Sequence, residues 1–309
     1  MNVFFHMVKR NVKLFLKDKG MVLSSLITPM ILLVLFATFL GNVYRDTFTS
    51  NLPEGVDVSS RVISGLVGGE LCSSLIAVSC VTVAFCANFL MVQDKVNGAR
   101  DDLLTSPVKK SSIALAYYAA TVISTLVICL LATALCFVYI ACTGWFLSFA
   151  DVILILSDII ILTLFGTVLS AIVNSFLTSQ GQISAVGTIV SAGYGFICGA
   201  YMPLSQFGAG LRNTLMFLPG TYGTSLIRNH MLGGVFREML SSGFPAEALE
   251  GIKDSVDCNL YFFGHGVSTG VMYAVMLGAI ALLVGIYVAI NLLTLKKPRA
   301  LKIKKKGGA

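Results

Sequence analysis

The chain has few charged residues. Asp, Glu, Lys and Arg make up 12% of its 309 positions, whereas hydrophobic residues make up 56%. A soluble domain carries about 25% charged residues. The mean hydropathy is +0.86. This composition excludes an ordinary soluble domain and predicts an all-α integral membrane protein.

The short motifs of common catalytic and nucleotide sites are also missing. The sequence contains no GxxxxGK[ST] loop, no HExxH, no GxSxG and no paired-cysteine metal spacing. We therefore expect no catalytic residue, no metal site and no cofactor on this chain. The histidines His6, His230 and His265 are scattered, which favours interfacial or loop positions over roles as ligands.

The eight cysteines do not form the pattern of a disulfide framework. All except Cys258 fall in apolar stretches, which favours packing as small hydrophobic residues. The net charge is +7, and the basic residues gather at the termini and in one central segment. That distribution indicates membrane orientation and argues against a nucleic-acid partner.

What the chain does contain is long apolar segments. Six are expected to span the membrane: 21–42, 62–92, 113–142, 151–176, 183–202 and 265–294. In the first, Pro29 either kinks the helix or marks its first turn. The second is long for a perpendicular crossing, so it either tilts or starts in the headgroup layer. Residues 43–60 are expected to form a short polar loop.

Basic residues predict the orientation of these spans. With six crossings, 16 Lys and Arg lie on the side of the termini and of residues 93–112, against 6 on the opposite side. The positive-inside rule therefore places both termini in the cytoplasm. We expect three parts: an N-terminal helix in residues 1–20, a six-span domain in 21–294 and a basic tail in 295–309. The expected location is a bacterial plasma membrane.

Residues 3–19 predict a basic amphipathic helix that lies in the membrane interface. Its polar face carries His6, Lys9, Arg10, Lys13 and Lys17. The long basic side chains suit anionic headgroups. The alternative is a simple basic flank of the first span.

Residues 93–112 form the densest charged segment between the apolar stretches. Asn97 or Gly98 can open a short helix there, with Asp101 and Asp102 in its first turn, where acids suit the helix dipole.

A serine and a proline follow this short helix. Ser106 and Pro107 are expected to end it and to start the next one, with Ser106 as the N-cap and Pro107 in the first helical position.

Residues 203–263 are too many for a plain loop. We expect a short apolar helix between Pro203 and Pro219 and a second that begins near Thr221. Both are candidates for re-entrant or interfacial helices because neither reaches the length of a span. Pro245 opens a further helix in the more polar remainder. One face of that helix carries Leu249, Ile252 and Val256.

Two acids interrupt the apolar segments. An ionised side chain at mid-span costs about 2.5–3.5 kcal/mol on insertion scales, so Glu70 and Asp158 are candidates for the transport path. Glu70 is expected to face a wet cavity. Alternatively, Glu70 is a surface residue, and Asp158 is a hydrated acid near the interface.

The order of these elements resembles the membrane subunit of a type-2 ABC transporter. The resemblance covers nearly the whole chain and implies that residues 3–19 are an elbow helix. It also implies a coupling segment G…LL.SP…(R/K), matched by Gly98, Leu103, Leu104, Ser106, Pro107 and Lys109. A later G…P and N-P-x-x-Y-x…R pattern is matched by Gly199, Pro203, Pro219, Tyr222 and Arg228, with Leu218 in place of Asn.

The resemblance assigns roles to these residues. In the coupling segment, Arg100, Asp101 and Asp102 offer charges to a groove of the ATPase, and Leu103 and Leu104 supply the apolar anchor. Residues 204–233 become an extracellular cap, in which Arg228 anchors the layer to headgroups or to an acid. The second and fifth spans are expected to line the path at a dimer interface.

The resemblance further implies an exporter. The partners would be two cytoplasmic ABC ATPase subunits, which hold ATP and Mg²⁺, a second permease copy or paralogue, and the lipid bilayer. The apolar walls suit a hydrophobic or amphipathic substrate such as a drug, antibiotic, lipid or lipopeptide. Alternatives are an exporter of lipid-linked glycan or polysaccharide, an intramembrane enzyme that uses the buried acids, and a channel.

Overall fold

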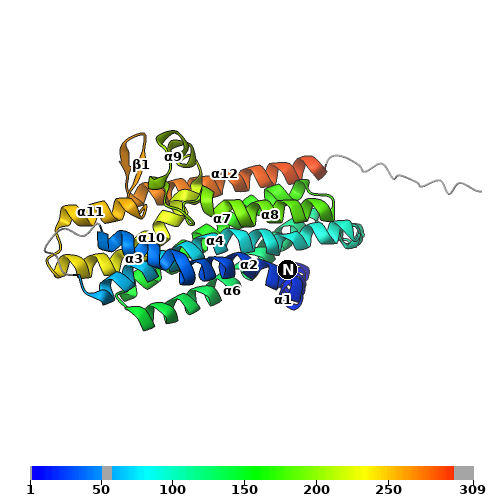
Figure 1. Cartoon of the computed structure of the whole chain (residues 1–309). Coiled ribbons are helices and arrows are strands. Elements are labelled where there is room, and N and C mark those ends of the chain that lie inside the picture. Colours follow the sequence, from blue (N-terminus) through cyan, green and yellow to red (C-terminus); the bar gives the residue numbers. More distant parts are fainter. Residues whose placement is uncertain (1, 51–57, 296–309) are drawn as a thin grey trace, which may run out of the picture.

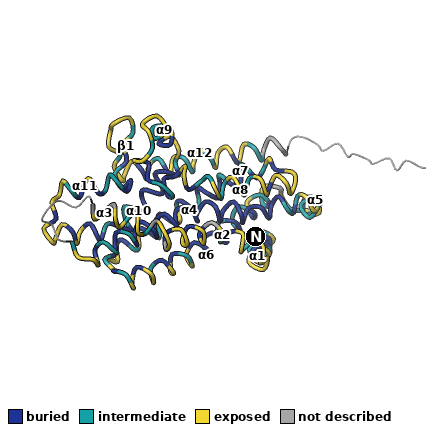
Figure 2. Tube along the Cα trace, in the orientation of Figure 1, coloured by how far each residue is buried: buried dark blue, intermediate teal, exposed yellow. Residues whose placement is uncertain are grey.

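The structure is a computed structural model that describes residues 2–50 and 58–295. Its long helices run side by side along an elongated bundle, and α1 (Asn2–Lys17) crosses one end (Figure 1). The end with α1 also holds the short helix α5 (Ala99–Thr105), while α3 (Gly41–Ser50) and α11 (Ala246–Ser255) lie at the other end (Figure 2). The expectation of a helical membrane protein is confirmed.

The centre of the bundle is α4 (Ser60–Val96). Its apolar stretch is entirely buried within the protein (Figure 2). The helices around it are α2 (Lys19–Leu35), α6 (Lys110–Thr143), α7 (Phe149–Phe176), α8 (Gln180–Ile197) and α10 (Pro219–Ser241). A helix that is apolar on all sides suits such a position. The expected path-lining role of the second span therefore needs correction, because the chain itself encloses α4, whereas α8 leaves one face open.

The N-terminal helix ends at Lys17, two residues before its predicted end. Asp18 caps α2 by accepting hydrogen bonds from the backbone N–H groups of Gly20 and Met21, at 2.9 and 3.1 Å. The chain bends by 71° between α1 and α2. This turn sets α1 across the end of the bundle, and its role as an elbow helix stays a prediction.

The first apolar segment continues farther than expected. Pro29 lies inside α2, and a π-helical turn (Phe36–Leu40) leads directly into α3. The prediction of a polar loop is wrong up to Ser50, because the polar segment carries Phe48, which packs against Val62 and Leu66 of α4. Residues 51–57 of that predicted loop lie outside the described residues, as does the predicted basic tail from residue 296 onwards, and the last residue of the predicted loop, Ser60, already begins α4.

The central charged segment forms α5 as expected, but the next helix starts later. Gly98 is the N-cap of α5, and its φ of +82° lies in the left-handed region that favours glycine. Ser106 and Pro107 lie in the connection, and α6 begins only at Lys110. The predicted N-cap role of Ser106 is wrong, because its hydroxyl donates back to the Leu103 carbonyl at 2.6 Å and so belongs to the end of α5.

The region before the last long helix is more helical than expected. A 3₁₀ turn (Leu204–Gln206) and α9 (Ala209–Leu215) occupy the segment between the prolines. The second helix, α10, has 23 residues and is largely buried, so it is longer than a short cap element. The helix α11 begins after Pro245, and the predicted face is buried: Leu249, Ile252 and Val256.

A small hairpin precedes the last helix. Strands β1 (Leu260–Phe262) and β2 (His265–Val267) pair antiparallel, and α12 runs over Thr269–Leu295. The expected start of the last span at residue 265 is therefore wrong, because the first residues form a strand. The hairpin and α9 project from one side of the bundle (Figure 1).

Four helices of the described chain are long and apolar enough to cross a membrane: Ser60–Val96, Ser111–Thr143, Phe149–Phe176 and Thr269–Asn291. The bent pair α1 and α2 brings the number to five if it is counted as one span. The fold is therefore that of a multi-pass membrane protein.

Candidate functional site

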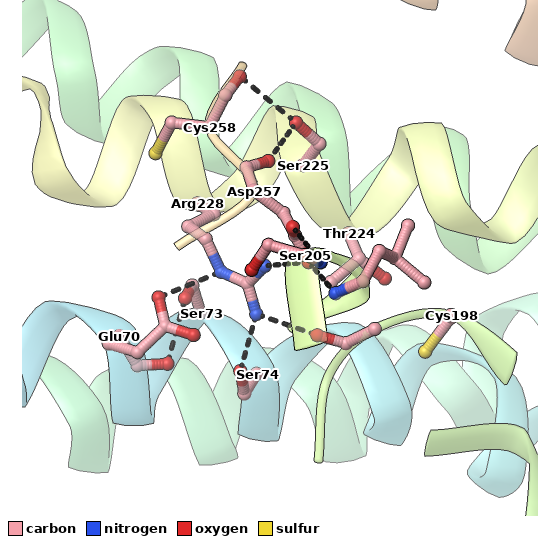
Figure 3. Close-up of polar contacts among 12 residues, drawn as sticks. Glu70, Ser73, Ser74, Cys198, Ser205, Thr224, Ser225, Arg228, Asp257 and Cys258 are labelled. Atoms are coloured by element: carbon pink, nitrogen blue, oxygen red, sulfur yellow. Dashed lines mark hydrogen bonds and ion pairs between the residues drawn. The ribbon is translucent and has the colours of Figure 1, made fainter. Parts of the chain in front are cut away.

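A buried ion pair joins α4 to α10. Arg228 Nε lies 2.8 Å from Glu70 Oε2, and the side chains are 1% and 0% exposed (Figure 3). Charges removed from water in this way are tolerated when each has a partner. The expected wet cavity beside Glu70 is therefore wrong: the carboxylate faces a guanidinium.

The same guanidinium also holds the end of α8. Arg228 Nη2 donates to Ser74 Oγ and to the Gly199 carbonyl oxygen, both at 3.0 Å (Figure 3). Gly199 follows α8 with a φ of +73°, which glycine adopts without strain. One side chain thus ties together α4, α10 and the turn after α8.

A second acid completes this cluster. Asp257 Oδ2 lies 3.7 Å from Arg228 Nη1, and its carboxylate accepts the backbone N–H groups of Leu204 at 2.5 Å and Ser205 at 3.2 Å. Asp257 lies between α11 and β1, outside the candidate spans. Burial raises the pKa of Asp257 to about 6, against the lowering effects of Arg228 and of the two N–H groups. We call Glu70, Arg228 and Asp257 the buried charge cluster.

The candidate cap residues surround this cluster. Pro219 is the first residue of α10, and the Tyr222 hydroxyl donates to the Met216 carbonyl at 2.7 Å. Pro203 is buried in the turn that Asp257 holds. Of the two expected partners of Arg228, headgroups or an acid, the structure shows acids. The prediction that these residues form a peripheral cap needs correction, because α10 packs within the bundle.

The second candidate acid lies in a separate cluster. Asp158 Oδ2 lies 2.6 Å from His230 Nδ1, and Oδ1 accepts the Tyr273 hydroxyl at 2.5 Å. The side chain of Asp158 is buried, so the alternative of a hydrated interfacial acid is wrong. The expected loop or interfacial position of His230 is also wrong, since it lies on α10 against α7. Such a histidine and acid can share a proton. Among the described residues, no group of His, Cys, Asp and Glu could hold a metal ion.

A third polar cluster fastens α1 to the C-terminal end of α4. Arg10 Nη1 lies 2.7 Å from Asp94 Oδ2, which also accepts the Tyr117 hydroxyl of α6 at 2.5 Å. Arg10 also donates to Asn11 Oδ1 at 2.8 Å. The other residues of the predicted basic face are exposed: His6, Lys9, Lys13 and Lys17. Arg10 thus contacts α4 of its own chain, while the other side chains of the basic face remain exposed on the surface.

The short helix α5 has a packed face and an open face. Leu103 and Leu104 are half-buried against the apolar cluster formed by α1, α4 and α6. Asp101 and Asp102 are exposed, and Arg100 is half-buried. The two leucines therefore pack α5 against the bundle, and the exposed face of α5 is acidic.

Sequence reasoning missed most of the partners in these clusters. Glu70 and Arg228 were singled out separately, yet Asp257, Ser74, Asp94, Tyr117 and Tyr273 were not connected to any site. The one signal that could have pointed to pairing is charge balance: an arginine and an acid in apolar surroundings each need a partner.

Comparison with known proteins gives a family. Residues 2–232 match the family described as ABC-2 type transporter. The match includes Glu70 and Arg228 and ends before Asp257. A comparison with curated proteins gives no match. The matched range covers most of the chain, so the chain belongs to the ABC-2 type transporter family and is a membrane-spanning permease subunit of an ABC transporter.

Proposed function

We propose that this permease exports a hydrophobic or amphipathic substrate across a plasma membrane. It works with two cytoplasmic ATPase subunits, which hold ATP and Mg²⁺, and with a second permease copy or paralogue. The chain crosses the membrane six times, with α2 and α8 as the additional crossings and both termini in the cytoplasm. The basic residues of α1 and the tail support this orientation.

The observation that carries the proposal is the continuity from α5 to the buried charge cluster. Leu103 and Leu104 pack α5 against the end of α4, and Asp94 joins that end to α1. The unbroken helix α4 reaches from there to Glu70. A push on α5 by an ATPase therefore has a rigid route to the junction of α4, α8 and α10. In this mechanism Gly98 permits the turn into α5, and Ser106 and Pro107 form the connection from α5 to α6.

The open face of α5 offers the sharper test. Asp101→Ala combined with Asp102→Ala removes the exposed acids without touching the packed leucines. We expect weaker copurification of the ATPase subunit and lower ATPase activity of the complex in proteoliposomes. Glu247→Ala is the matched control, because Glu247 is an exposed acid on α11 at the opposite end of the bundle.

Leu103→Asp with Leu104→Asp forms the second arm. This change should detach α5 from the bundle. We therefore expect weaker binding of the ATPase and less stimulation of its activity by substrate. If ATPase binding and stimulation survived both double changes, residues 98–107 would not be the coupling element.

The substrate class is supported by the open face of α8. It exposes Ile189, Phe196 and Ile197 alongside small residues, and such a wall suits apolar groups better than sugars. The test compares stimulation of ATPase activity by amphipathic drugs or lipopeptides with stimulation by lipid-linked glycans. Stimulation by glycans alone would favour the alternative exporter of the same family.

A further inference from the structure

An open groove lies at the end of the bundle opposite α5, and none of its lining residues belongs to the three polar clusters described above. It has a volume of about 490 Å³ and runs between the α6–α7 connection and the last turns of α10. Its polar and aromatic lining consists of Trp145, Phe146, Ser148, Arg237, Glu238 and Ser241. Gly234 forms part of its wall. The Phe146 backbone comes so close to Gly234 that a Cβ at that position would overlap the Phe146 carbonyl group.

The indole ring in this groove is held in place. Trp145 Nε1 donates to the Leu147 carbonyl at 2.8 Å, and the ring meets Phe137 edge to face at a centroid distance of 5.8 Å. The residue nevertheless remains 39% exposed. A fixed and partly open indole is the best aromatic surface for a cation.

The groove has one exposed carboxylate that no described residue pairs. Both Arg237 terminal nitrogens contact the Asp151 carboxylate, with Nη1 at 3.3 Å from Oδ1, so this arginine is already neutralised. Glu238 is exposed, and its carboxylate has no ion-pair partner among residues 2–50 and 58–295. Arg61 lies 5.9 Å from the centroid of the Phe146 ring, which also lines the groove, so Glu238 supplies an exposed carboxylate there but no net negative charge.

We propose that this groove binds an organic ammonium group, either on a zwitterionic phospholipid headgroup or on a free amine. The ammonium lies against the Trp145 ring and takes Glu238 as its counterion. An aromatic ring attracts a cation through its quadrupole, and a carboxylate attracts it as a counterion, so together they suit a quaternary ammonium, which has no N–H to donate, as well as a primary one. Arg237 and Ser241 border the same groove and can donate to an anionic group attached to the ammonium, such as a phosphate.

The chain supplies its own reporter, since Trp145 is its only tryptophan. The full-length protein in phosphatidylglycerol nanodiscs is titrated with choline chloride at constant ionic strength while indole emission is followed. The matched ligand is 3,3-dimethyl-1-butanol, which has the shape of choline without its charge. We expect a saturable change with choline and about tenfold or weaker binding of the neutral alcohol. Equilibrium dialysis with radiolabelled choline measures the same binding without fluorescence.

Variants separate the site from general effects. Glu238→Gln should weaken choline binding by about tenfold, whereas Glu247→Gln, an exposed acid on α11, should leave it unchanged. Equal binding of the neutral alcohol, an unchanged affinity in Glu238→Gln, or no choline binding by either method would overturn the proposal. Loss of the choline response in phosphatidylcholine nanodiscs identifies the lipid headgroup as the occupant, and an unchanged response identifies a free amine.

Discussion

The helix α4 carries an ion pair toward each of its ends, and the two pairs differ in burial. Glu70 and Asp94 are separated by about 36 Å along the helix. The side chains of Arg228 and Glu70 are 1% and 0% exposed, whereas those of Arg10 and Asp94 are 36% and 9% exposed. Both pairs join an acid on α4 to an arginine, so their main difference is how far each pair is exposed.

That difference decides what each pair can do. A fully buried pair has lost its hydration, so either charge left alone is costly. Arg228 compensates with contacts to Ser74, Gly199 and Asp257. A pair that water still reaches contributes little to stability, because solvent screens it. The first pair therefore defines how α4, α8 and α10 meet, and the second attaches α1 to a bundle that is already formed.

The largest effect is expected from breaking the buried pair. Arg228→Met leaves Glu70 without its partner and should destabilise the protein by about 3–5 kcal/mol. The measurement is thermal unfolding of the purified protein in detergent. Arg228→Met combined with Glu70→Leu should recover part of the loss, since fewer unpaired charges remain. No recovery would mean that Arg228 acts mainly through Gly199 and Asp257.

A smaller effect is expected at the other end of α4. Arg10→Ala should cost less than about 1 kcal/mol of global stability, because the pair is partly exposed. It should instead loosen α1, which limited proteolysis of residues 2–17 would detect as faster cleavage. Lys13→Ala is the matched control, since Lys13 is exposed on the same helix. Equal cleavage of both variants would contradict a clamp at Arg10.

The smallest effect is expected from salt, which distinguishes the two ion pairs without any mutation. At about 1 M salt the screening length falls to about 3 Å, which weakens exposed pairs and spares buried ones. Salt should therefore speed cleavage of α1 in the unmodified protein, while the unfolding temperature changes little. A large fall in the unfolding temperature would show that salt reaches the Glu70–Arg228 pair.

Local features of this fold could be predicted from the sequence. The left-handed turn at Gly98 and the buried face of α11 follow from residue type and helical spacing. The start of α6 could not be predicted, because Ser106 and Pro107 carry a cap signal, yet the Ser106 hydroxyl bonds back to the end of α5. Likewise, α3 looks polar in sequence, yet Phe48 gives it a partner on α4.

The candidate sites were less predictable because their contacts are remote. Glu70 and Arg228 each stand out as charges in apolar surroundings, but only the packing of α4 against α10 shows that they meet. Asp257 lies in a polar stretch, where an acid carries no signal at all. The roles of Leu103 and Leu104 also depend on tertiary structure, since their apolar surface fits either an ATPase or α1 and α6.

The enclosed position of α4 has a consequence for biosynthesis. Ser74, one helical turn after Glu70, precedes Arg228 by 154 residues, so at about 5–20 residues per second the ribosome delivers the arginine about 8–30 s after this part of α4. During that interval Glu70 has left the ribosome without the arginine that neutralises it. The nascent chain must therefore shelter this acid, at the translocation machinery or near the bilayer surface, until α10 arrives.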